Sequence, residues 1–118
     1  MDDVFERLKA IMVPVTGTLD VQIDKPGHFD VNTFHIMKNK KPLWFGGVQI
    51  KKNYVSYHLM PIYANPELLA DLSAPLKKRM QGKSCFNFKV VDEALFDELA
   101  ALTRRSFEDY ASKGFVDV

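Results

Sequence analysis

The sequence predicts one α+β domain, in which an antiparallel sheet of about five strands carries helices mainly on one face. The 118 residues fall in the commonest size range for one domain, so we expect residues 1–118 to fold as a unit. The stretch from Pro42 to Tyr63 alternates apolar and polar residues on both sides of a short basic turn at 51–53, which is typical of a β-hairpin. Both ends of the chain instead space their apolar residues as helices do.

The first half of the chain predicts one helix followed by four strands. Apolar residues at helical spacing indicate an amphipathic helix from Val4 to Val13, and Pro14 is expected to end it. Alternating residues on both sides of a Lys-Pro-Gly-His turn then predict a hairpin over residues 19–36. A second turn at 38–41 leads into the hairpin described above. Because consecutive strands usually pair with each other, we expect a four-strand antiparallel meander.

The second half predicts two short helices, a fifth strand and a long closing helix. Residues 65–67 (Asn-Pro-Glu) place a capping residue, a proline and an acid in the order that opens a helix. Residues 73–75 (Ser-Ala-Pro) open another helix by the same logic, and Gly82 is expected to follow its end. Residues 84–90 alternate as a strand does. The final helix is expected to run from a cap at Asp92 to about Gly114.

The composition argues against several classes of protein. The chain has 16 basic and 15 acidic residues, a net charge of +1, which is too balanced to gather nucleic acid or anionic lipid. No stretch approaches the roughly 20 apolar residues of a membrane span, so we expect neither a nucleic-acid partner nor a membrane. The acidic N-terminus lacks the basic start of a secretory signal, and a single cysteine fits a reducing compartment. We therefore expect a cytoplasmic protein.

The candidate binding site follows from the alternation of the last two strands. Successive side chains of a strand point to opposite faces, so Tyr54, Ser56 and His58 should lie opposite the apolar Val55, Tyr57 and Leu59. The same rule places Cys85 and Asn87 opposite Phe86 and Phe88. The resulting set of predicted ligand-binding residues is Trp44, Phe45, Tyr54, Ser56, His58, Cys85 and Asn87. If helices cover the apolar set, these residues form an open face, which is a ligand pocket, a dimer contact or solvated surface.

Three familiar kinds of chemistry find little support in the motifs. Residues 82–84 (Gly-Lys-Ser) match the end of a phosphate-binding loop, but Lys77 occupies the position of its first glycine. His28, His35, His58 and Cys85 show no metal-ligand spacing, so we expect no metal site and no cofactor. A catalytic pair of Cys85 and His58 is conceivable on the open face, although nothing local predicts a lowered pKa for the thiol.

The pattern of residues 42–112 resembles the YdhG-like family of bacterial domains of unknown function. The resemblance is carried by the hairpin of residues 46–58 (GGVQIKKNYVSYH), the helix that opens at Asn65, and the Gly-Lys-Ser turn at 82–84, which leads into the strand with Phe86 and Phe88. It implies a compact α+β domain with helices mainly on one side of the sheet. Some relatives are described as frataxin-like iron chaperones, and the acids that could serve such a role here are Asp2, Asp3, Glu6, Asp20 and Asp24. No position matches a defined iron-ligand motif.

These observations predict a non-enzymatic intracellular protein that uses the open face to bind a small ligand or a partner. Two alternatives remain: a frataxin-like iron-binding chaperone, and a small enzyme that uses His58 and Cys85. The expected partners are a small molecule, another protein or a second copy of the chain.

Overall fold

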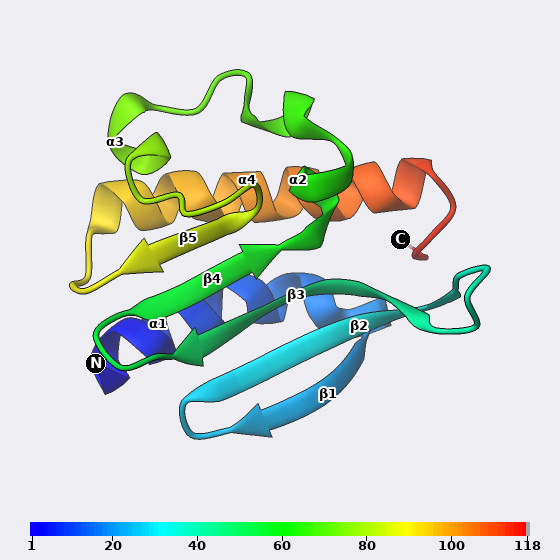
Figure 1. Ribbon diagram of the computed structural model, residues 1–118, viewed down its shortest axis with the longest axis horizontal. Helices are drawn as coiled ribbons and strands as arrows, with labels where there is room; N and C mark the ends of the chain where they lie inside the picture. Colours follow the sequence, from blue (N-terminus) through cyan, green and yellow to red (C-terminus); the bar gives the residue numbers. More distant parts are fainter. Residues whose placement is uncertain (118) are drawn as a thin grey trace.

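A five-strand antiparallel sheet carries two long helices on one of its faces (Figure 1). The computed structural model describes residues 1–117. In chain order the elements are the helix α1 (Asp2–Met12), the 3₁₀ helix η1 (Val13–Thr18), the strands β1 (Asp20–Lys25), β2 (His28–Ile36), β3 (Pro42–Ile50) and β4 (Val55–Leu59), the helix α2 (Met60–Ala64), the 3₁₀ helix η2 (Pro66–Leu69), the helix α3 (Ala74–Lys77), the strand β5 (Cys85–Phe88) and the helix α4 (Glu93–Ser112). The predicted fold class is confirmed.

The strands pair in the order β1-β2-β3-β4-β5, so each strand lies next to its neighbour in the sequence. All four pairings are antiparallel. In the pairing of β4 with β5, Ser56 lies opposite Asn87 and His58 lies opposite Cys85. The alternation of the sequence therefore brings these four side chains onto one patch of the sheet.

The hydrophobic core lies between the sheet and the pair formed by α1 and α4. Val55, Tyr57 and Leu59 of β4 are fully buried against these helices, as the alternation predicts. The helices bury Val4, Phe5, Leu8, Met12, Phe96, Leu99, Leu102 and Tyr110. Each large apolar side chain removed from water contributes about 1.5–3 kcal/mol, so this layer fixes which face of the sheet stays open.

The helix caps predicted from the sequence form at two of three positions. Asp92 Oδ1 accepts a hydrogen bond from the Leu95 amide at 3.2 Å, and Ser73 Oγ accepts one from the Leu76 amide at 3.3 Å. Asn65 does not cap a helix. Its side-chain Nδ2 instead donates to Asp109 Oδ1 at 2.8 Å, because α2 brings this residue next to α4.

The segment between β4 and β5 differs most from the prediction. The hairpin predicted over Pro42 to Tyr63 ends at Leu59, and the short helix α2 follows, with Pro61 in its first turn. The helix expected to end near Gly82 stops at Lys77. Residues 78–84 form a loop, and its residues 79–81 run along β5, since the Asn87 amide donates to the Arg79 carbonyl and the Gln81 amide donates to the Cys85 carbonyl. No helix within residues 1–117 is long and apolar enough to cross a membrane.

Candidate functional site

A groove of about 620 Å³ lies over the face of the sheet that α1 and α4 leave open. Strands β2 to β5 form its floor. Residues Gln81 to Ser84 of the loop beside β5 form one wall, and Met60 and Tyr63 from α2 close the end of that wall. The groove is thus made by elements that are far apart in the sequence but meet above β4.

Six of the seven predicted ligand-binding residues line this groove. They are Trp44, Tyr54, Ser56, His58, Cys85 and Asn87. Ser56 is 7% exposed, so it offers little surface to a ligand, whereas the other five are half-buried and more open.

The prediction for Phe45 is wrong. Its side chain is fully buried on the helix side of the sheet, where it makes edge contacts with Phe107 and Tyr110 at ring distances of 6.3 and 6.0 Å. Neighbouring residues of a strand point to opposite faces, so Phe45 cannot share the open face with Trp44. The register between β2 and β3 also shifts here, which leaves Phe45 without a partner on β2.

Trp44 is held in place by two contacts at one end of the groove. Its indole Nε1 donates a hydrogen bond to Asp30 Oδ1 at 2.8 Å, and its ring lies 5.1 Å from the ring of His58. Gly47 leaves the space that Asp30 needs, because a Cβ at this glycine would lie 2.8 Å from the same carboxylate oxygen. Sequence reasoning missed Asp30 and Gly47. Their positions on alternating strands next to Trp44 were the available signal.

Asn87 connects the floor of the groove to its wall. Its Nδ2 donates to Gln81 Oε1 at 2.8 Å, and its Oδ1 accepts from the Cys85 thiol at 3.5 Å. The amide is therefore engaged at both ends, which fixes its orientation. This arrangement positions the polar groups of β5 before any ligand arrives.

Cys85 and His58 lie opposite each other, but both are held in their neutral forms. Burial raises the pKa of the Cys85 thiol, and a backbone hydrogen bond from Tyr57 and the charge of Lys51 offset this only in part. Burial also lowers the pKa of His58; Lys51 lowers it further and Asp30 opposes the change. The thiol donates to Asn87 rather than to the imidazole. A neutral thiol beside a neutral imidazole is a weak nucleophile.

The loop residues at the wall were not predicted to belong to the site. Lys83 Nζ lies 5.7 Å from the ring centre of Tyr63, within range of a cation–π contact. Gly82 has a φ of +79°, which a glycine adopts readily where the loop turns back toward β5. The order of elements around the Gly-Lys-Ser segment is helix, loop, strand, as the sequence indicated, so it does not form the strand–loop–helix of a phosphate-binding loop.

The acids suggested for iron do not form a metal centre in the part of the chain that the structure describes. Residues 1–117 contain no group of three or more histidine, cysteine, aspartate or glutamate side chains placed to hold a metal ion. Asp24 forms an ion pair with Lys9 at 2.6 Å, which lowers its availability to a cation. Iron binding stays a prediction that rests on the family resemblance.

The fold and the groove define a class: an α+β domain whose sheet is covered by helices on one face and carries an aromatic and polar groove on the other. Comparisons with known proteins returned no match to a family model, a curated protein or a solved structure. Membership of the YdhG-like family therefore stays a prediction from the residues quoted above.

Proposed function

We propose that this protein binds a small organic molecule in the groove and holds it without changing it chemically. The observation that carries the proposal is the groove itself, whose volume of about 620 Å³ falls within the range of roughly 300–1,000 Å³ typical of small-molecule sites. Aromatic rings from Trp44, Tyr54 and Tyr63 line it together with a few fixed polar groups. This mixture of apolar surface and oriented polar groups is typical of ligand pockets.

The contacts among the lining residues support binding rather than catalysis. Trp44 is fixed by Asp30, and Asn87 is fixed by Gln81, so two parts of the groove are held in place without a ligand. A site that is already ordered loses less conformational entropy when it binds. The pKa shifts of Cys85 and His58 keep both side chains neutral, which favours a binding role over a thiolate enzyme.

A nuclear magnetic resonance screen with a library of neutral and charged fragments tests this proposal. We expect saturable shifts of the Ser56 and Asn87 amides and of the Trp44 indole N–H, the signal of the chain's single tryptophan. An Asn87→Trp variant should lose the shift of the Ser56 amide because the larger ring fills the groove; this amide is the signal to follow, since the variant has two indole N–H groups. Lys41→Trp adds the same side chain at an exposed position outside the groove, and it should bind fragments as the original chain does.

The proposal fails if no fragment shifts these signals, or if Asn87→Trp binds every fragment as well as Lys41→Trp does. A homodimer through the open face is the competing use of the same surface. Mass measurement in solution separates the two uses, because a dimer that buries the groove should dissociate when Asn87→Trp is introduced. Cytoplasmic location stays part of the proposal.

A further inference from the structure

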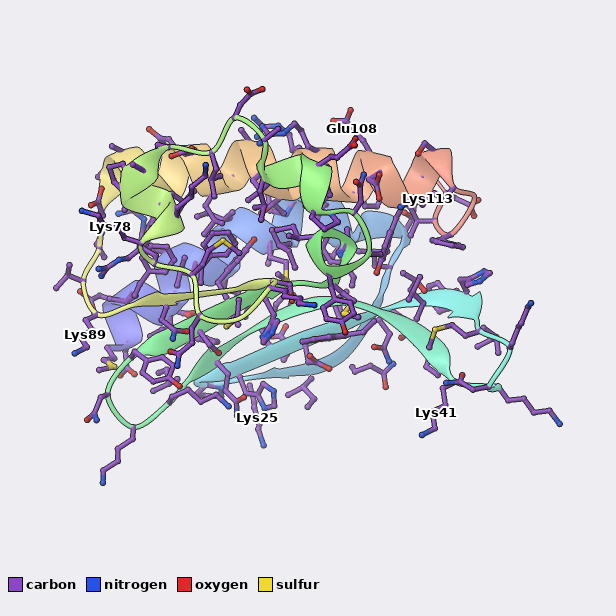
Figure 2. The ribbon with its side chains drawn as sticks, turned by 45° about the horizontal axis from the view of Figure 1, so that its top comes forward. Lys25, Lys41, Lys78, Lys89, Glu108 and Lys113 are labelled. Atoms are coloured by element: carbon purple, nitrogen blue, oxygen red, sulfur yellow. The ribbon has the colours of Figure 1, made fainter. Side chains whose placement is uncertain are left out.

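A second hollow of about 250 Å³ continues the groove beyond Tyr54. The two hollows share three lining residues, Tyr54, Gln81 and Asn87, so they are parts of one surface. Lys78, Arg79 and Lys89 line the second hollow. Figure 2 shows Lys78 and Lys89 at the same end of the molecule, whereas Lys41 lies at the opposite end.

Positive charge dominates this combined surface. Lys51 and Lys83 line the groove, and the three basic residues of the second hollow bring the total to five. Asp30 is the sole carboxylate among the described residues that line either hollow. The whole chain has 16 basic and 15 acidic residues, so an excess of five to one is a local property of this surface.

These cations are available to a ligand. Within residues 1–117, none of the five takes part in an ion pair, and all five are exposed. The one carboxylate nearby, on Asp30, already accepts the hydrogen bond of Trp44. Lys51 acts on the floor of the groove itself, since its charge lowers the pKa of both His58 and Cys85.

Three of the five cations lie away from the aromatic end of the surface: Lys78, Arg79 and Lys89 line the second hollow, whereas Lys83 contacts Tyr63 at the wall of the groove. Trp44 and His58 lie together at one end, while Tyr54 lies four residues before His58 on the same side of the strand. Four residues of a strand span about 13 Å. This length suits a molecule that places a ring between the aromatic side chains and a charged group beyond Tyr54.

We propose that the ligand of the groove is an aromatic molecule that carries a phosphate or carboxylate group, with its ring near Trp44 and His58 and its anion among the basic residues beyond Tyr54. This inference rests on the proposed small-ligand function and names the chemical class that the groove selects. Lys38, Lys40 and Lys41 lie on the hairpin away from the groove, so the basic residues do not form one track for a polymer. A small anion fits this separation better than an extended nucleic acid.

Matched pairs of probes test the ligand class by titration followed through the Trp44 indole N–H. Adenosine 5′-monophosphate is compared with adenosine and inorganic phosphate, and indole-3-acetate is compared with indole and acetate. At least one acid should bind about tenfold tighter than its neutral ring and than its anion alone, as expected for one charge-assisted contact. Comparison of the two acids shows whether phosphate or carboxylate is preferred.

Charge reversal tests where the anion lies. Lys89→Glu should weaken the bound acid about tenfold at low ionic strength and leave the neutral ring unaffected, whereas Lys41→Glu should change neither. Both lysines are exposed, so both variants are expected to fold. Lys51→Glu provides a second position at the groove.

Three results would overturn the inference: neutral rings that bind as tightly as the acids, equal losses in Lys89→Glu and Lys41→Glu, or a twelve-nucleotide single-stranded DNA that binds more tightly than either acid. If neutral fragments bind in the groove and the acids gain nothing, the ligand class is wrong while the proposed function stands. If no probe and no fragment binds, the proposed function fails with it.

Discussion

A buried hydrogen-bond chain between β4 and α4 offers the sharpest test of how the open face is held in place. Tyr57 and Thr103 are both fully buried, and their hydroxyl oxygens lie 2.7 Å apart. The Thr103 hydroxyl donates its one proton to the Leu99 carbonyl at 2.8 Å, so the Tyr57 hydroxyl must be the donor to Thr103. Burial raises the pKa of Tyr57, which keeps this donor protonated.

The two partners are therefore not equivalent, and the structure predicts unequal costs for removing them. Tyr57→Phe removes one hydrogen bond and leaves Thr103 bonded to Leu99, so it should lower the free energy of unfolding by about 1 kcal/mol. Thr103→Val keeps the side-chain shape but leaves the Tyr57 hydroxyl buried without an acceptor, which should cost about 2 kcal/mol. The double variant leaves no buried donor without an acceptor, so it should lower the free energy of unfolding less than Thr103→Val alone does.

Urea denaturation of the four proteins, followed by circular dichroism, measures these values as a double-mutant cycle. The expected coupling between the two substitutions is about 2 kcal/mol. If the cost of the double variant equals the sum of the two single costs to within about 0.3 kcal/mol, the reasoning is refuted, because the hydroxyls then do not interact. A Tyr57→Phe variant less stable than Thr103→Val would refute the assigned donor direction.

Three further predictions concern the sheet and the groove. Gly46→Ala should cost about 3 kcal/mol in urea denaturation, because its Cβ would collide with the His58 carbonyl across the β3–β4 pair; a cost below about 1 kcal/mol would show that the strands can separate. Cys85 should react with iodoacetamide at pH 7 more slowly in the folded chain than in urea, because burial raises the pKa of its thiol. A faster reaction in the folded chain would favour the alternative that the protein is an enzyme. The lowered pKa of His58 means that its contribution to stability is complete above about pH 6.5 and is lost as the pH falls through the folded-state pKa. Denaturation between pH 7.5 and 5.5 should therefore show a weaker pH dependence in His58→Gln, and an unchanged dependence would contradict the assignment.

The sequence predicted the parts of the fold that depend on local periodicity. The division of residues 54–59 into Tyr54, Ser56 and His58 on one face and apolar residues on the other follows from alternation alone, and the structure has this division. The cap at Asp92 was predictable because a cap acts within three residues of itself. Local patterns of this kind need no knowledge of distant contacts.

The features that were missed depend on contacts between distant segments. Phe45 lies beside an irregular register between two strands, and nothing in the neighbouring residues fixes that shift. Lys83 joins the groove because the chain turns out of α3 and residues 79–81 pair with β5, which depends on the backbone groups that β5 leaves free. The wall and the positive charge of the site therefore appeared only once the chain was folded.

The pairing of residues 79–81 with β5 also determines how the sheet meets other molecules. An edge strand has unpaired backbone N–H and C=O groups that can pair with a strand of another molecule. Residues 79–81 occupy the free backbone groups of β5. At the other end, β1 has an irregular register at Gln22 and the charged side chains of Asp20, Asp24 and Lys25, which disfavour the addition of another strand. A substitution that detaches the loop would thus both open the binding groove and expose a site for strand-to-strand aggregation.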